Sequence, residues 1–452
     1  MKKIILYIGL AIALLAIVFA LNGAYAAVQN DIKAAEQNAE DTFEDSLVLS
    51  SGLPVIYVET NGQDISKDQE VFVKISVYET YEVTGETHPE TMDAVVKYRG
   101  SSSYLTFDKK QYRIEFRAEQ GSEKNEEYSI MNLSSASDWV LNGPFLDRTL
   151  SRNYLGYTVS RMLLPWAPDT EYCELYIDGE YQGLYLLVEP VTNEAGRLNL
   201  SDYSLVSGRC SYIARFDIAE AGETALETYG EINCTVTNDV ILSYPSPSNL
   251  TYIQKEYVTN DISEFEQALC SDYFDDPEIG YAKYINVDSF VDYFIISEMM
   301  MITDGGYFST YFYKDLAPGS KIEITVWDFN NSFDNMPWYS VSYEEFHLVD
   351  SNWFKRLVQD ENFVDKVVAR YHELRQGVLS DETLIGMLDE NIEYIGSAAE
   401  RNFELWGYTF NEHLMSGGKD PQSFEEAVSM LKEAIKMRGA YLDENIQSLY
   451  EY

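Results

Sequence analysis

The stretch CELYIDGEYQGLYLLVE, residues 173–189, decides the architecture of the first half of this chain. Two apolar runs of strand character, residues 173–177 and 185–189, lie on either side of Asp178-Gly179. Asp-Gly between such runs is a strong signal for a β-hairpin, because both residues tolerate the left-handed backbone of a tight turn. The sequence therefore predicts a hairpin at this place.

Other segments of strand character lie before and after the hairpin. Residues 110–117 alternate most clearly between apolar and polar side chains, which is the period of a half-buried strand. The remaining segments are at residues 53–58, 70–77, 95–98, 309–314 and 321–326. Because most of these short runs fall early in the chain, they predict a β-rich N-terminal part.

Helical periodicity dominates the later part of the chain. Apolar side chains recur at intervals of three and four residues over 287–301 and throughout the region after about residue 350. Two earlier helices are predicted at 150–164 and at 261–268, where Asp261 and Glu264 have the spacing of a capping box. Strands followed by helices indicate an α+β fold with a helical C-terminal part.

The composition is strongly acidic. The 452 residues include 75 Asp and Glu but only 32 Lys and Arg, so the formal net charge is −43. Such a surface repels the phosphates of nucleic acid and the headgroups of anionic lipid, so we expect neither as a partner. Hydrophobic residues make up 46% of the chain, which is enough for a sizeable core, and the length suits two or three domains.

The first 27 residues have the features of a signal peptide or signal anchor. Lys2 and Lys3 precede an apolar run at 4–21, and Ala24-Tyr25-Ala26 is a small-x-small cleavage pattern. The run is also long enough for a short membrane span. We therefore expect export to the outside or the surface of the cell, with membrane attachment only through this segment if it is uncleaved. Residues 28–50 are polar and acidic and are predicted to be a linker.

Two aspartates carry the strongest signal for chemistry. Asp304 lies in the Gly-rich segment Thr303-Asp304-Gly305-Gly306, and Asp328 follows a strand-like segment in Trp327-Asp328-Phe329-Asn330. An acid in a Gly-rich loop, a β segment and an acid at a strand end is the arrangement by which kinases hold a catalytic base and Mg²⁺ ligands. One or two protein carboxylates are enough to bind Mg²⁺, because substrate phosphates supply further oxygen ligands.

Lys110 opens the alternating segment and shares its apolar face with Tyr112 and Ile114 by the period of two. A lysine on an apolar face must be paired or must reach into a cleft, and a strand lysine that grips phosphate is what a kinase needs. Glu189, at the end of the hairpin, is a candidate partner. The alternatives are a lysine at a frayed strand start that extends to water and a solvated glutamate.

Three further features suit a nucleotide. Arg152 lies near the start of a predicted helix, where free N–H groups and a guanidinium favour phosphate, although an N-cap with a surface salt bridge is the alternative. Residues 100–103, Gly-Ser-Ser-Ser, are predicted to form a loop whose N–H groups cradle phosphate. Trp327 is a candidate for stacking on a base, although a buried structural Trp is more common. No GxGxxG or P-loop motif occurs, which excludes ordinary kinases and P-loop enzymes.

The four cysteines leave the disulfide pattern open. They allow three full pairings, and no Cys or His spacing indicates zinc. A Cys210–Cys234 bridge is plausible outside the cell, since both residues lie in or near strand-like segments. Isolated buried thiols are the alternative.

Several of these segments together resemble the CotH kinase family, the atypical protein kinases related to spore coat protein H. The most specific likeness is ELYIDGEYQGLY at residues 174–185. The other blocks occur in the family's order, at 99–103 (RGSSS), 109–114 (KKQYRI), 138–141 (DWVL), 152–153 (RN), 304–305 (DG), 327–329 (WDF) and 402–406 (NFELW).

The resemblance implies an atypical protein-kinase-like, two-lobed fold with a core at 51–350 and a helical part at 351–452 packed on it. It implies binding of ATP with Mg²⁺ or Mn²⁺ and transfer of the γ-phosphate to Ser or Thr hydroxyls of a protein substrate that the sequence does not identify. Within it, Lys110 would contact phosphate and be held by Glu189, Asp304 would act in catalysis, and Asp328 would bind the metal.

Two positions depart from the family pattern. Ile302-Thr303 stand where the family often has Asn-Pro, and Asn330 stands where it often has Asp. Asn330 can still serve as a metal ligand, but it brings less charge than a carboxylate. The alternative function is therefore a surface binding or adhesion protein, or a structural envelope protein, on a catalytically weak kinase-like scaffold.

Overall fold

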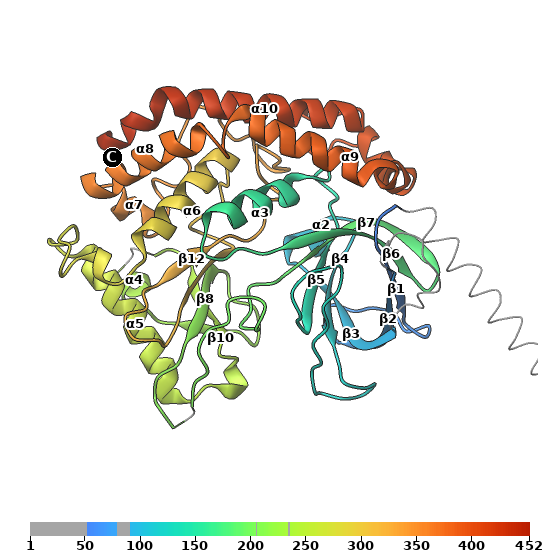
Figure 1. The fold of residues 1–452 in the computed structure, drawn as a ribbon, viewed down its shortest axis with the longest axis horizontal. Coiled ribbons are helices and arrows are strands. Elements are labelled where there is room, and N and C mark those ends of the chain that lie inside the picture. The colour runs from blue at the N-terminus through green and yellow to red at the C-terminus, as the bar shows by residue number, and fades with distance from the viewer. Residues whose placement is uncertain (1–51, 79–90, 205, 234–235) are drawn as a thin grey trace, which may run out of the picture.

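A computed structural model describes residues 52–78, 91–204, 206–233 and 236–452 (Figure 1). The predicted export segment, the linker and Cys234 lie outside these residues. Cys173 and Cys210 are buried thiols. Within the described part of the chain, no helix combines the length and the apolar character that crossing a membrane would need.

A closed barrel occupies the N-terminal part, with strand order β1-β2-β3-β4-β5-β7-β6 (Figure 1). The parallel pair of β1 and β6 closes it, and the other neighbours are antiparallel. The strands are β1 (Val55–Glu59), β2 (Val71–Tyr78), β3 (Thr91–Arg99), β4 (Gln111–Phe116), β5 (Asp138–Asn142), β6 (Thr170–Ile177) and β7 (Glu180–Val188). Closure of the sheet is a feature that the strand periodicity did not predict.

The hairpin at 173–189 is confirmed as β6 and β7, which pair along their whole length. Asp178 and Gly179 form the turn with φ of 49° and 85°, the left-handed backbone expected of Asp-Gly. The Asp178 carboxylate also accepts hydrogen bonds from the backbone N and the hydroxyl of Thr60, at 2.7 and 2.5 Å. The turn therefore also secures the end of β1.

A second sheet of five strands has the order β12-β11-β8-β10-β9. Its strands are β8 (Tyr212–Asp217), β9 (Thr224–Leu226), β10 (Asp239–Tyr244), β11 (Thr310–Lys314) and β12 (Glu323–Thr325). Strand β11 comes from sequence almost 100 residues after β8 and pairs directly with it. This pairing brings the segment after Asp304 beside the end of β8.

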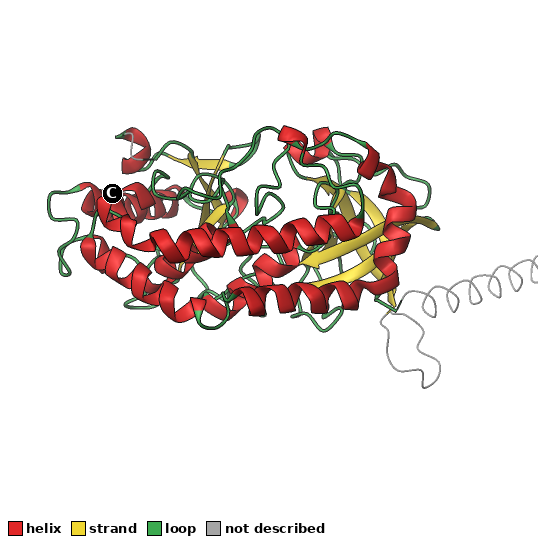
Figure 2. Ribbon diagram, turned by 90° about the horizontal axis from the view of Figure 1, so that it is seen from above, coloured by secondary structure: helices red, strands yellow, loops and turns green. Residues whose placement is uncertain are grey.

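Most of the helices lie together on one side of the two sheets (Figure 1), and the two longest run side by side across the molecule (Figure 2). The helices are α2 (Ser102–Thr106), α3 (Arg152–Leu163), α4 (Tyr229–Ile232), α5 (Tyr252–Cys270), α6 (Val287–Met300), α7 (Phe354–Leu357), α8 (Glu361–Arg375), α9 (Asp381–Trp406) and α10 (Phe424–Asn445). The predicted α+β fold, β-rich first and helical later, is confirmed.

Two local predictions were wrong. The helix expected at 261–268 begins nine residues earlier, because Thr251 and Gln254 form the capping box in place of Asp261 and Glu264. The loop expected at 100–103 is a turn at Gly100 followed directly by the short helix α2. For α5 the capping contacts decide the boundary, whereas Ser101 before α2 makes no side-chain capping hydrogen bond.

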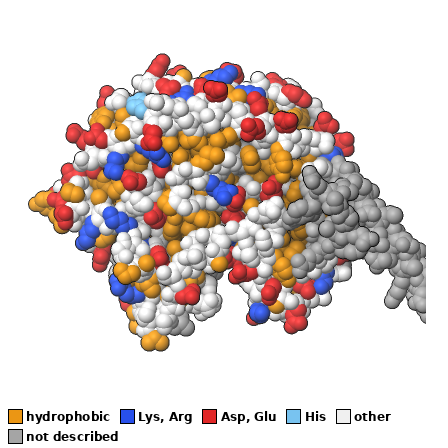
Figure 3. Space-filling model, viewed as in Figure 1, with side chains coloured by type: hydrophobic (Ala, Val, Ile, Leu, Met, Phe, Trp, Pro, Cys, Tyr) orange, Lys and Arg blue, Asp and Glu red, His pale blue; other side chains and the backbone are white. Residues whose placement is uncertain are grey.

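The core consists of one large and two smaller hydrophobic clusters. The barrel encloses its own cluster, to which β4 contributes Tyr112, Ile114 and Phe116 on its inward face. The largest cluster joins the second sheet to the helices and includes residues from Leu53 to Leu449. Acidic side chains spread over the outer face of the molecule (Figure 3), as the composition requires.

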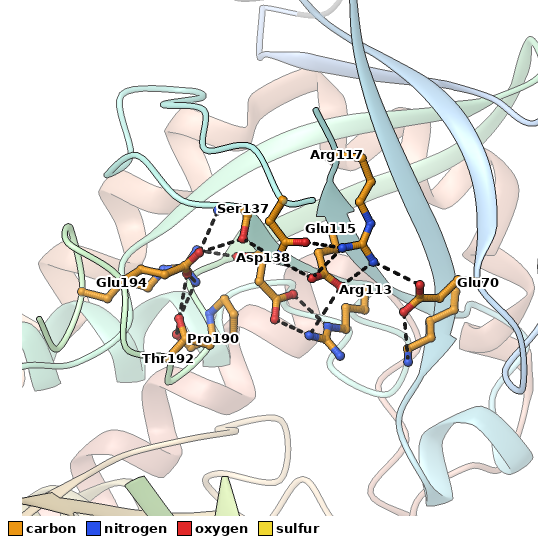
Figure 4. A network of polar contacts seen from close by, with 12 residues as sticks. Glu70, Arg113, Glu115, Arg117, Ser137, Asp138, Pro190, Thr192 and Glu194 are labelled. Carbon is orange, nitrogen blue, oxygen red and sulfur yellow. Dashed lines mark hydrogen bonds and ion pairs between the residues drawn. The ribbon is translucent and has the colours of Figure 1, made fainter. Parts of the chain in front are cut away.

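Polar side chains cover the outside of β4 and β5 (Figure 4). Arg113 binds Asp138 through two hydrogen bonds of 2.9 and 2.6 Å. Glu194 accepts hydrogen bonds from the backbone N and the hydroxyl of Ser137, at 2.8 and 2.9 Å. The chain leaving the barrel after β7 is thereby fixed against the barrel wall.

A fully buried ion pair joins α6 to α10. Glu298 and Arg438 are 1% and 0% exposed, and their side chains meet at 2.6 Å. The Glu298 carboxylate also accepts hydrogen bonds from the backbone N of His347 and Leu348, while Arg438 donates to the carbonyls of Glu298, Tyr343 and Glu345. The hydrogen bonding of this pair is what compensates for its loss of water.

Replacing Arg438 by Met leaves the Glu298 carboxylate buried without its counter-charge. We expect the free energy of unfolding to fall by about 3–5 kcal/mol, measured by urea denaturation. Lys436→Met on the same helix is the control, because Lys436 and Glu433 form an exposed pair, and it should leave the unfolding curve unchanged. Equal effects of the two substitutions would contradict a central role for the buried pair.

Candidate active site

Asp304 lies just beyond the C-terminus of α6. The helix ends at Met301, which has a φ of 55°, and the chain then turns through Gly305 and Gly306 into β11. Gly306 has a φ of 74°, and a Cβ there would collide with the hydroxyl of Ser351, so the turn requires glycine. The Asp304 Oδ2 accepts a hydrogen bond of 3.2 Å from Asn331 Nδ2, which joins the two predicted acidic segments.

Asp328 lies three residues beyond β12 in a left-handed backbone conformation, with a φ of 68°. Non-glycine residues rarely adopt it, and such strain concentrates at functional sites. Helix α3 holds the segment in place: Tyr157 Oη accepts from the Asp328 N at 3.1 Å, and Asn153 Oδ1 accepts from the Phe329 N at 2.6 Å. The carboxylate itself accepts from the Asn330 N at 2.9 Å.

Asp304, Asp328 and Asp217 form one group of interacting negative charges. Burial raises the pKa of Asp304, and the charges of Asp328 and Asp217 raise it further, against a hydrogen bond from Asn331. Burial is also the main cause that raises the pKa of Asp328, which Asn330 and Arg99 oppose. A raised pKa makes a carboxylate a stronger base. The sequence did not indicate Asp217 as a candidate site residue, although it is the last residue of β8.

Arg99 is the cation whose charge opposes the raised pKa of Asp328. It ends β3, and its guanidinium carbon lies 5.5 Å from the centre of the Trp327 ring. Its Nη1 donates to Gln111 Oε1 at 2.7 Å. The sequence placed Arg99 only at the start of a loop, whereas in the structure it is the last residue of β3 and pairs with Gln111 of β4.

A chain of amide side chains connects Arg99 with the Asp328 segment. Asn142 Nδ2 donates to Gln111 Oε1 at 3.3 Å, and Asn153 Nδ2 donates to Asn142 Oδ1 at 3.1 Å. Asn153 Nδ2 also donates to Asn330 Oδ1 at 3.0 Å. Strands β4 and β5 of the barrel are thus hydrogen-bonded through α3 to the segment that carries the candidate metal ligands.

Trp327 is partly exposed rather than part of the deep core. Its ring centre lies 6.1 Å from the ring centres of both Tyr157 and Tyr311. Arg99 lies against the same ring system. The predicted stacking on a base is therefore compatible with the exposure of this side chain and stays a prediction.

The predicted pair of Lys110 and Glu189 does not form. Lys110 Nζ donates to the carbonyls of Tyr104 and Phe107 at 2.8 and 2.7 Å, which fastens α2. Glu189 is 2% exposed and accepts from the Asp169 N at 3.1 Å. Burial raises the pKa of Glu189, and the cations that act on its charge are Arg197 and Arg161.

The buried lysine is Lys109 rather than Lys110. Lys109 is 2% exposed and donates to Leu184 O and Asn402 Oδ1 at 2.6 and 2.8 Å. Burial holds its pKa well below the usual value. The period of two did not identify it because β4 begins at Gln111, so both lysines precede the strand.

Arg152 and Asn330 already have protein partners. Arg152 Nη1 binds Asp147 Oδ1 at 2.5 Å, and its Nε donates to Ser332 O at 3.0 Å. Asn330 Oδ1 accepts from Asn153, and Asn330 O accepts from Asn335 Nδ2 at 2.7 Å. The expected role of Arg152 at phosphate and that of Asn330 at a metal stay predictions.

Among the residues that the structure describes, no three His, Cys, Asp or Glu side chains are arranged to hold a metal ion. Mg²⁺ does not require such a cage when a nucleotide supplies phosphate oxygens. The donors that suit it are the oxygens of Asp328 and Asn330, both on the segment held by α3. These two residues stay the predicted donors for Mg²⁺, with nucleotide phosphates to supply further oxygens.

A protein family described as CotH kinase protein matches residues 96–442. The match includes Arg99, Asp217, Asp304 and Asp328. A comparison with curated proteins found no match.

Gly156 gives a test of how tightly α3 holds the Asp328 segment. A Cβ at this position would collide with the ring of Phe329, so Gly156→Ala should lower the free energy of unfolding by about 1–3 kcal/mol through overpacking. Gly386→Ala in α9 is the matched control, since nothing lies within 4 Å of its Cβ, and it should stabilise by about 0.5–1 kcal/mol. Thermal or urea unfolding of both variants makes the comparison, and a stabilised Gly156→Ala would contradict this packing.

Proposed function

Because this chain belongs to the CotH kinase family, we propose that it is an atypical protein kinase that transfers the γ-phosphate of ATP to Ser or Thr hydroxyls of a protein. The observation that carries the proposal is the convergence of Asp304 and Asp328, which are linked through Asn331 and interact through their charges. The proposed fold is kinase-like and two-lobed, with the barrel as one lobe and the second sheet with its helices as the other.

Asp304 is the proposed base. Its Oδ2 is oriented by Asn331, and its Oδ1 accepts no hydrogen bond from the described residues. This oxygen is therefore available for the proton of a substrate hydroxyl. The raised pKa of Asp304 brings it closer to the pH at which a general base is most effective.

Asp328 and Asn330 are the proposed ligands of Mg²⁺ or Mn²⁺, which would neutralise charge on the transferred phosphate. Trp327 would offer its ring to the base of ATP. We assign the phosphate contact to Arg99 rather than Lys110, because the charge of Arg99 acts on Asp328, whereas the Lys110 ammonium is held by two carbonyls. A guanidinium also suits the geometry of phosphate.

Export to the cell surface or beyond rests on the N-terminal sequence alone and is part of the proposal. The alternative function is a binding or structural protein on a catalytically weak scaffold. What favours it is the engagement of candidate groups by the protein itself, namely Lys110 at the carbonyls of α2 and Asn330 Oδ1 at Asn153. A substrate would have to compete with these hydrogen bonds.

Two aspartate variants separate nucleotide binding from catalysis. With ATP and Mg²⁺ or Mn²⁺ present, the wild-type melting temperature should rise by about 2 °C or more. Asp328→Ala should lose this rise together with phosphotransfer. Asp304→Asn should keep it but lose about 10²–10⁴-fold in rate, because only the base is removed.

The measurements are thermal denaturation and transfer of labelled phosphate to the chain itself or to added protein. Asp272→Ala is the control, since Asp272 is exposed after the end of α5 and should behave as wild type. Absence of any metal-dependent rise in the wild type would reject the kinase proposal in favour of the binding or structural alternative.

A further inference from the structure

A cavity of about 470 Å³ lies between α10 and the loops around residues 333–343 and 415–421. Asp304, Trp327 and Asp328 do not line it, whereas Arg152, for which the sequence predicts a phosphate contact, does. Its volume is that of a pocket for a small organic molecule. The sequence contained no signal for it, because its walls come from three distant segments, at 146–152, 333–343 and 415–437.

Much of the lining is apolar and adaptable. Phe333 and Leu146 form part of the floor, and Met415, Met430 and Met437 lie around it. Met430 and Met437 are 39% and 48% exposed, so they border the opening. Methionine side chains are flexible and polarisable, and they recur at surfaces that accept varied apolar ligands.

Arg152 gives the cavity an open hydrogen-bond donor, although its charge is paired with that of Asp147. The residue lines the cavity and is only 9% exposed. Its Nε and Nη1 are bonded to Ser332 and Asp147, whereas its Nη2 donates to no residue in the described part of the chain. A guanidinium nitrogen with free N–H groups at a nearly buried position is a donor for an anionic ligand.

The other charged groups of the lining have partners within the protein. Lys419 pairs with Asp334, Arg148 pairs with Asp420 at 2.9 Å, and Glu433 pairs with Lys436 at 2.8 Å. Glu426 accepts from the backbone N of Gln422 at 2.6 Å. Asp334 and Glu433 therefore have cation partners, and Glu426 has a backbone donor. Arg148 Nε also lacks a hydrogen-bond partner, but that atom is fully buried, so Arg152 Nη2 is the open donor that would select a ligand with an anionic acceptor.

We propose that this cavity binds a small amphipathic anion. Its apolar body would lie against the methionines of α10 and the 415–421 loop, and its carboxylate or phosphate would accept hydrogen bonds from Arg152 Nη2. None of the residues to which the proposed function gives a role lines the cavity, so binding can be tested whether or not the chain is a kinase.

Isothermal titration of the full chain, without nucleotide, tests the proposal with four probes. Octanoate and octyl phosphate carry the two candidate head groups, octyl glucoside has the same chain without charge, and inorganic phosphate has the charge without the chain. We expect one-to-one binding of at least one octyl anion, with octyl glucoside and inorganic phosphate at least about tenfold weaker. The tighter of the two anions identifies the head group.

Two substitutions locate the binding. Met430→Glu and Met437→Glu each place a carboxylate at the opening, where partial exposure lets the fold tolerate it. Because the new charge repels an anion, each substitution should lower the affinity for the octyl anion at least about tenfold. Met162→Glu is the matched control, since Met162 is 57% exposed on α3 and does not line the cavity. The proposal is overturned if neither anion binds, if octyl glucoside binds equally well, or if all three glutamate variants bind as the wild type does.

Discussion

The buried pair of Glu298 and Arg438 is the constraint on which the rest of the helical part depends. Taking two charges out of water is favourable only when both are fully hydrogen-bonded, and here that requires α6, residues 343–348 and α10 to meet at one point. Asp304 follows Glu298 by only six residues along the chain. The pair therefore anchors the end of α6 that leads to the proposed base, and it also holds α10, which lines the cavity.

A second constraint joins the barrel to the candidate active site, and it is built from neutral amides. The series Gln111, Asn142 and Asn153 runs from Arg99 to the segment after Asp328. Amides both donate and accept, so they satisfy one another without adding charge beside the acidic group. Such a buried network favours one arrangement of the barrel relative to the segment that carries Asp328. It also supports the left-handed backbone of Asp328.

Some of the few cations of this acidic chain stabilise the fold, whereas others direct part of their side chain toward the candidate active site or the cavity. Lys109, Arg148 and Arg438 are buried and hydrogen-bonded within the protein, while Arg99 and Arg152 keep part of their guanidinium directed to the active site or the cavity. Sequence spacing cannot separate these classes, because a lysine or arginine is equally compatible with either. Lys110 illustrates this: its position before β4 resembles that of a phosphate-binding lysine, yet its ammonium fastens α2.

The sequence by itself determined the hairpin at 173–189, the α+β layout and helix α6, because each depends on turn chemistry or periodicity. From local motifs it also predicted Asp304 and Asp328 as site residues. Only the tertiary structure decided the closure of the barrel, the pairing of β8 with β11 that places Asp217 near both aspartates, the partners of Lys109 and Lys110, and the cavity beside Arg152. These features join residues that are tens to hundreds of positions apart, as when Lys109 meets Asn402. Local periodicity carries no information about which distant segments will meet, since that choice is made by the packing of the whole core.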